Sequence, residues 1–172
     1  IANSVEIPFM MYNVPGRTGV DLDANTTIRL FDDIKNIYGV KEATGSLERA
    51  ICLLSQRKDF VVVSGDDAID FPMLANGAKG IISVTANLLP NLKSQLVNSV
   101  FKGDLEKARQ INEDLYSLNS VLFCESNPIP IKAAMYLAGL LDTLEYRLPL
   151  TAPSMETMKK LEKTLEKYEV IK

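Results

Sequence analysis

Residues 36–46 read NIYGVKEATGS, and this short segment contains both a strand and the point where that strand ends. Ile37, Tyr38 and Val40 belong to residue types that favour strands, and the ATGS that follows has the composition of a turn. Lys41 stands at the junction. An ammonium group is costly to bury, so the simplest interpretation is that Lys41 pairs with a carboxylate at the rim of a sheet. The alternative is that Lys41 is a nucleophilic amine, with Glu42 as a structural partner.

Similar apolar segments recur along the first half of the chain, separated by segments of helical periodicity. The predicted strands are residues 9–14, 37–42, 60–65 and 79–85. The predicted helices between them are residues 24–35, one capped by Ser46, and one capped by Asp67 that extends through Leu74. Parallel strands need crossover connections of this length, so we expect a parallel sheet.

Beyond residue 88 the pattern is helical only. Pro90 is expected to begin one helix, and Asp104 to cap a longer one. Two more helices are predicted within residues 127–140 and 152–168, where apolar residues recur at spacings of three and four.

Four parallel strands alone leave two open edges and two apolar faces. Four βα units are half of an eight-unit barrel, which typically needs about 250 residues. We therefore predict an α/β fold in which residues 1–88 form the C-terminal half of a TIM (β/α)8 barrel. Residues 89–172 would then form the last barrel helix and a C-terminal α-helical domain. The opening IANSV, which lacks an initiator Met, reads as the last turn of a helix and suggests a chain that begins within a larger protein.

The rival fold is a small open doubly wound sheet. The phosphate-binding motifs typical of that class, G-x-G-x-x-G and G-x-x-x-x-G-K-[ST], are absent from the sequence.

Composition excludes several classes of function. The 172 residues include no histidine, which removes Ser-His-Asp triads, Cys-His pairs and His-containing zinc sites from this chain. The net charge of −3 and the pI of about 5.1, without a basic cluster, argue against nucleic acid as a partner. No apolar run approaches the roughly 20 residues of a membrane helix. The two cysteines are isolated, which suits a reducing compartment.

In a barrel, catalytic groups gather at the C-terminal ends of the strands. Here those ends carry a phenol, a guanidinium and an amine, from Tyr12, Arg17 and Lys41. Taken singly, each has an ordinary structural explanation, such as a core aromatic or a rim ion pair. Together they suit carbonyl chemistry on an anionic substrate: an amine forms an imine, a phenol moves protons, and a guanidinium holds a carboxylate.

Five segments, in order along the chain, resemble the dihydrodipicolinate synthase family of Schiff-base-forming class I aldolases. They are YNVPGRTG, GVKEATGS, SGDD, GIISVTAN and NPIPIK. GVKEATG is shared loosely with N-acetylneuraminate lyase and 2-keto-3-deoxy sugar-acid aldolases, whereas the first and last segments are more specific. The similarity covers the whole chain and matches the C-terminal part of such enzymes.

This resemblance implies a role for five residues. Lys41 would form the Schiff base with pyruvate, Tyr12 would relay protons, and Arg17 would bind the carboxylate of aspartate semialdehyde. Gly65 and Ile82 would line the pyruvate pocket. The implied reaction condenses pyruvate with (S)-aspartate 4-semialdehyde to give 4-hydroxy-tetrahydrodipicolinate in lysine and diaminopimelate biosynthesis. The family is implied to be a cytoplasmic homotetramer that uses no metal and no organic cofactor.

Two other functions stay open. A sister aldolase for another 2-keto acid would share Lys41 and Tyr12, but Arg17 argues against it. A catalytically silent homologue that only assembles or binds would be expected to have lost the lysine or the tyrosine, and both are present. A threonine pair and an interface tyrosine implied by the resemblance fall outside these residues.

Overall fold

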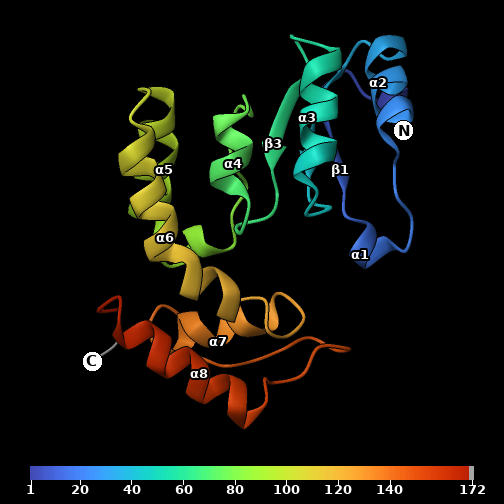
Figure 1. Cartoon of the computed structure of the whole chain (residues 1–172). Helices are drawn as coiled ribbons and strands as arrows, with labels where there is room; N and C mark the ends of the chain where they lie inside the picture. Colours follow the sequence, from blue (N-terminus) through green and yellow to red (C-terminus); the bar gives the residue numbers. More distant parts are fainter. Residues whose placement is uncertain (171–172) are drawn as a thin grey trace. The chain divides into compact units, whose positions relative to one another are not determined.

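The chain forms two compact units in a computed structural model that describes residues 1–170 (Figure 1). The first unit comprises Ile1–Ser83 with Ser99–Leu105, and the second comprises Val84–Asn98 with the chain from Glu106 on. The strands lie in the first unit, and the described residues of the second unit are helical or irregular.

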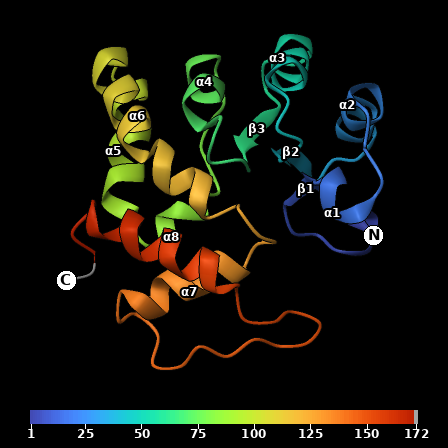
Figure 2. The same ribbon diagram turned by 60° about the horizontal axis from the view of Figure 1, so that its bottom comes forward.

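The sheet of the first unit has three parallel strands in the order β1-β2-β3 (Figure 2). They are β1 (Phe9–Asn13), β2 (Ile37–Glu42) and β3 (Val61–Ser64). The predicted strands at 9–14, 37–42 and 60–65 and their parallel pairing are therefore confirmed.

The fourth predicted strand, residues 79–85, was wrong in extent. The segment follows β3 only briefly, through a single parallel bridge between Ser64 and Ile81. Hydrogen bonds from the Ser64 N–H to the Gly80 carbonyl (3.0 Å) and from the Ile82 N–H to the Ser64 carbonyl (2.8 Å) flank this bridge. The backbone then turns into the right-handed helical region at Val84 and enters the 3-10 helix η2 (Thr85–Asn87), so the ladder cannot continue.

The helices of the first unit precede, connect and follow its strands. They are the 3-10 helix η1 (Ala2–Ser4) and the α-helices α1 (Pro15–Thr18), α2 (Ala24–Asp33), α3 (Leu47–Gln56) and α4 (Asp70–Ala75). Ser46 caps α3 as predicted, because its hydroxyl accepts the Arg49 N–H at 3.2 Å. The predicted Asp67 cap was wrong: Ile69 precedes α4, and the Asp67 carboxylate accepts a hydrogen bond from the Ser83 hydroxyl instead.

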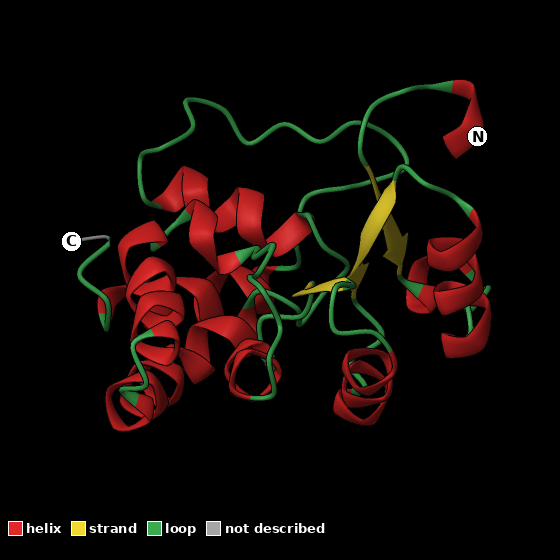
Figure 3. Ribbon diagram, turned by 90° about the horizontal axis from the view of Figure 1, so that it is seen from above, coloured by secondary structure: helices red, strands yellow, loops and turns green. Residues whose placement is uncertain are grey.

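One hydrophobic core lies between the sheet and its helices. Figures 2 and 3 show α2, α3 and α4 along one side of the strands. Val40 and Val62 of the sheet and Leu53 of α3 are completely buried in this core. The Phe31 and Phe60 rings pack against each other there, with centroids 4.9 Å apart.

The pairing of β1 with β2 contains one irregularity. Phe9 pairs with Ile37, but Met10 pairs with Gly39, so β2 carries one extra residue at this point. A side chain at Gly39 would place its Cβ 2.2 Å from the carbonyl oxygen of Val61 on β3, so glycine is required by close approach of the backbones. Beyond the irregularity the ladder is regular up to the carboxyl ends of the strands.

The four helices predicted from residue 90 on are all present. They are α5 (Pro90–Phe101), α6 (Leu105–Val121), α7 (Ile129–Leu137) and α8 (Met155–Glu166). The second unit has its own core, in which Leu118 of α6, Ala134 of α7 and Leu161 of α8 are completely buried. Among the described residues, no helix has the length and apolarity needed to cross a membrane.

Candidate active site

Lys41 and Tyr12 lie side by side at the carboxyl end of the sheet. The two residues are paired in the parallel register of β1 and β2, so their side chains project from the same face. The Lys41 Nζ sits over the Tyr12 ring, 4.3 Å from its centroid, within the range of a cation–π contact. Tyr12 is 53% exposed and Lys41 is half-buried, so an amine and a phenol meet at a surface that solvent reaches.

The simplest interpretation of Lys41, a rim ion pair, was wrong. Among residues 1–170, no carboxylate forms an ion pair with the Lys41 amine. The neighbouring Glu42 instead forms an ion pair with Arg49. The Lys41 amine therefore lies against the Tyr12 ring and not against a carboxylate of the described residues.

Gly65 makes room for the lysine side chain. A Cβ at this position would lie 2.7 Å from the Lys41 Cε and 2.9 Å from the Ala43 Cβ. The Gly65 N–H donates to the Glu42 carbonyl at 2.8 Å, which continues the sheet hydrogen bonds past the end of β3. Gly65 thus acts through its missing side chain, because any larger residue would displace the methylene chain of Lys41.

Arg17 and Ile82 lie on segments next to this group. Arg17 is exposed in the last turn of the short helix α1, which directly follows β1. Ile82 is also exposed, on the segment that bridges to β3. The structure thus brings Tyr12, Lys41 and Gly65 into one group, and it places Arg17 in α1 and Ile82 on the segment that follows β3 and α4.

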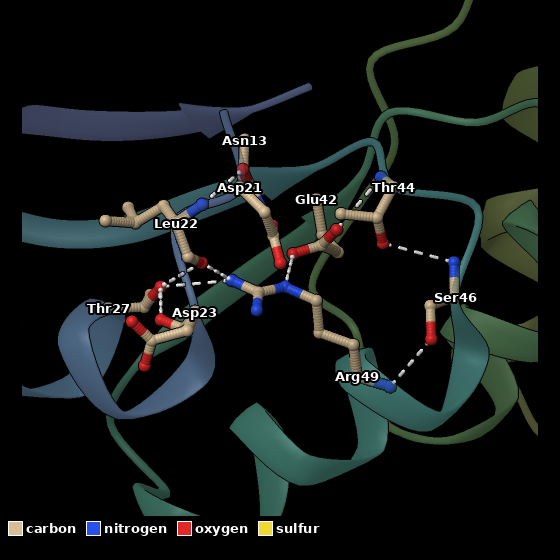
Figure 4. A network of polar contacts seen from close by, with 9 residues as sticks. All are labelled: Asn13, Asp21, Leu22, Asp23, Thr27, Glu42, Thr44, Ser46 and Arg49. Atoms are coloured by element: carbon tan, nitrogen blue, oxygen red, sulfur yellow. Dashed lines mark hydrogen bonds and ion pairs between the residues drawn. The ribbon is translucent and has the colours of Figure 1, made fainter. Parts of the chain in front are cut away.

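The opposite face of the same strand ends carries a buried polar network (Figure 4). Glu42 is only 1% exposed, and its two carboxylate oxygens accept from the Arg49 Nε at 2.7 Å and from the Thr44 N–H at 2.9 Å. The expectation that Glu42 is a structural partner is therefore confirmed.

Sequence reasoning missed Arg49, although one signal was available. Ser46 caps α3, so Arg49 lies in the first turn of the helix, where the helix dipole disfavours a cation. A cation in that position suggests a nearby carboxylate, which here is Glu42.

Hydrogen-bond partners shift the pKa values of the carboxyl groups of Asp23 and Asp32 in the first unit. Hydrogen bonding from the Thr26 backbone N–H at the start of α2 lowers the pKa of Asp23. The hydrogen-bonded Arg57 guanidinium lowers the pKa of Asp32. Over residues 1–170, no group of three or more Cys, Asp or Glu side chains is arranged to hold a metal ion.

The fold and the site together define a class of protein: an α/β protein with parallel strands that presents a lysine amine beside a phenol at the carboxyl ends of the strands. Comparison with known sequences specifies the family. The chain belongs to the dihydrodipicolinate synthetase family, whose model matches residues 1–168.

Individual relatives and solved structures support this family assignment. The chain is 76% identical, over all of its 172 residues, to the 4-hydroxy-tetrahydrodipicolinate synthase of Aliarcobacter butzleri. The match spans 58% of the length of that protein. The crystal structure of dihydrodipicolinate synthase from Aquifex aeolicus matches with a TM-score of 0.94 at 40% identity, over 98% of this chain and 58% of that one. The synthase from Acinetobacter baumannii, solved with pyruvate, matches with a TM-score of 0.94 at 42% identity, over 99% of this chain and 58% of that one.

Proposed function

We propose that this chain provides the Schiff-base centre of a 4-hydroxy-tetrahydrodipicolinate synthase. This lyase would condense pyruvate with (S)-aspartate 4-semialdehyde in lysine and diaminopimelate biosynthesis. The observation that carries the proposal is the Lys41 Nζ placed 4.3 Å from the centroid of the Tyr12 ring. The pyruvate bound in the related Acinetobacter baumannii enzyme supports pyruvate as the first substrate.

Lys41 carries the covalent steps of the proposed reaction. Its deprotonated Nζ attacks the C2 carbonyl carbon of pyruvate, and the carbonyl oxygen leaves as water to give an imine. Loss of a proton from the methyl carbon gives an enamine, which attacks the aldehyde carbon of the second substrate to form the new C–C bond. The amino group of that substrate then attacks the imine carbon, closes the ring and releases Lys41.

Tyr12 and the surrounding residues assist these steps. The Tyr12 hydroxyl, whose ring lies beside the amine, delivers protons to the departing oxygen and accepts them in ring closure. Arg17 binds the carboxylate of the semialdehyde through paired hydrogen bonds. Gly65 and Ile82 line the pocket for pyruvate.

The proposal extends to architecture and assembly. The parallel sheet and its helices form the C-terminal half of a (β/α)8 barrel, followed by a C-terminal helical domain, with a division near residue 88. The TIM-barrel structures that the chain matches over 58% of their length support this arrangement. The complete enzyme is a cytoplasmic homotetramer that needs no metal or organic cofactor.

Trapping of the imine tests the proposal. We suggest a chimeric enzyme in which this chain replaces the matching segment of the 76% identical Aliarcobacter butzleri synthase. Incubation with pyruvate and borohydride should reduce the imine and add the pyruvate-derived mass to the peptide containing Lys41. The variant Lys41→Arg should remain unlabelled, and Lys58→Arg, which changes an exposed lysine before β3, should label normally. Labelling of another lysine, or of none, would contradict the proposal.

A further inference from the structure

The segment that carries Arg17, residues 14–20, is closed by the side chain of Asn13 (Figure 4). Asn13 is buried at the end of β1, directly before this segment. Its Nδ2 donates to the Asp21 carboxylate at 2.9 Å, and its Oδ1 accepts the Leu22 N–H at 3.1 Å. One amide side chain therefore joins the beginning of the segment to its end.

Arg49 attaches the far end of the same segment to the scaffold. Its Nε donates to Glu42 at 2.7 Å, and a terminal nitrogen donates to the Leu22 carbonyl and to the Thr27 hydroxyl. The Thr27 hydroxyl also donates to the Leu22 carbonyl, at 3.2 Å. Leu22 is thus held through both its N–H and its carbonyl, from β1 on one side and from α3 on the other.

The residues of this network are tied to the reactive pair through the sheet register. Asn13 pairs with Glu42, one step beyond the pairing of Tyr12 with Lys41. Successive side chains of a strand point to opposite faces. The same two strand ends therefore present the amine and the phenol on one face and anchor the Arg17 segment on the other.

From this arrangement we propose that Asn13, Glu42 and Arg49 form a clasp that positions the Arg17 segment beside the Lys41–Tyr12 pair and thereby sets the affinity for the second, carboxylate-bearing substrate. This inference rests on the function proposed above. The three are positioning residues, because they act through Arg17 and have no contact with the reacting atoms.

A purely structural role would explain the clasp less well. Replacing a buried ion pair by apolar residues of similar volume is often neutral or stabilising. An apolar pair in place of Glu42 and Arg49 could fill the space, but it could not bind the Leu22 carbonyl and the Thr27 hydroxyl. What the ion pair adds is a fixed position for a loop.

Two variants distinguish a positioning role of the clasp from a general contribution to stability. Asn13→Ala removes both contacts to the loop and leaves the Glu42–Arg49 pair intact. Arg49→Lys keeps a cation near Glu42 but loses the planar fork that reaches three acceptors. Arg57→Lys is the matched control, because Arg57 forms an exposed ion pair with Asp32 outside the network.

The measurement is steady-state kinetics of the chimeric enzyme with each substrate varied. Both clasp variants should raise the KM for the semialdehyde by about 10-fold or more, the size expected for a lost hydrogen bond to a charged group, and Arg17→Ala should do the same. The KM for pyruvate and the borohydride labelling of Lys41 should stay close to the parent values, as should all constants of Arg57→Lys. An equal rise in both KM values would overturn the proposal.

A second measurement does not depend on activity. The N–H groups of Arg17, Thr18 and Gly19 donate to the carbonyls of Val14 and Pro15 within the segment. Their hydrogen exchange should be faster in Asn13→Ala and Arg49→Lys, and unchanged exchange would overturn the clasp. If borohydride traps no imine in the parent enzyme, the proposed function fails, and the hydrogen-exchange measurement alone tests the clasp. If Arg49→Lys does not fold, the double variant Glu42→Gln/Arg49→Met takes its place, because it removes both buried charges.

Discussion

Two successive pairs of residues join the ends of β1 and β2, and their surroundings differ sharply. In the first pair, Tyr12 is 53% exposed and lies under the amine of Lys41. In the second pair, Asn13 and Glu42 are buried, and the side chain of each makes two hydrogen bonds. A step of one residue along the strand thus separates the face for which we propose a reactive role from a buried structural face. Substitutions in the first pair should therefore affect turnover, and substitutions in the second should affect stability and loop position.

The largest effect is expected from Lys41→Arg in the chimeric enzyme. A guanidinium cannot form the imine, so kcat should fall by about 10³-fold or more, while the thermal melt should stay cooperative. Lys58→Arg is the control. If Lys41→Arg kept more than a tenth of the parent kcat, Lys41 would not be the residue that forms the imine.

The second largest effect is expected from Glu42→Leu. This change leaves the Arg49 cation buried without its partner, which should lower the free energy of unfolding by about 3–5 kcal/mol, measured by urea denaturation. In the matched variant Asp32→Leu, the lost partner is 38% exposed, and the free energy of unfolding should change far less than in Glu42→Leu, because solvent screens an exposed ion pair. Equal losses in the two variants would show that burial does not distinguish these ion pairs.

A smaller effect is expected from Tyr12→Phe. The ring over which Lys41 lies is kept, but the hydroxyl that moves protons is lost, so kcat should fall by about 10²-fold. Tyr38→Phe changes an exposed tyrosine of the same sheet and should leave kcat unchanged. If Tyr12→Phe mainly lowers the unfolding temperature and leaves kcat unchanged, the Tyr12 hydroxyl has a structural role and does not move protons.

The smallest effect is expected from Glu125, a half-buried carboxylate of the second unit that contrasts with the fully buried Glu42. Hydrogen bonding with Thr157 and Ser154 lowers the pKa of Glu125 from its usual value of 4.5. The Ser154 N–H and hydroxyl donate to it at 3.0 and 2.9 Å, beside the start of α8. Because the pKa is lower in the folded state, the stabilisation is complete above pH 4.5 and is lost as the pH falls through the folded-state pKa.

Glu125→Gln should therefore lower the unfolding temperature at pH 7 by less than about 3 °C, and this difference should shrink in melts recorded below pH 4.5. Glu162→Gln, on an exposed position of α8, is the control. A difference that grows at acidic pH would contradict the assigned direction of the pKa shift.

Most of the fold could be predicted because its signals are local. The strand at 37–42 was predicted with its observed bounds, and the Ser46 cap follows from residues within one helical turn. The strand at 79–85 was overpredicted because residues that favour strands continue past the point where the backbone turns at Val84. Asp67 was misassigned as a cap because its partner, Ser83, is distant in the sequence.

The site was predictable only in part, for the same reason. The chemistry that we propose for Lys41, Tyr12 and Arg17 follows from residue types at strand ends and from the family motifs. The link from Arg49 to Glu42, Leu22 and Thr27 joins three separate elements, and no spacing along the chain encodes it. Similarly, the space that Gly65 leaves for Lys41 becomes apparent only when β2 and β3 lie side by side.

The extra residue in β2 has a consequence for how this protein tolerates changes in length. Tyr38 lies between the pairing of Phe9 with Ile37 and that of Met10 with Gly39. A deletion of Tyr38 would shorten the strand where it is already irregular, and Lys41 could keep its place opposite Tyr12. A deletion at Val40 would instead bring Glu42 into that place and turn every later side chain to the other face. Insertions and deletions that persist among descendants of this gene should therefore fall before Gly39, while the chain from Gly39 to Glu42 keeps a fixed length.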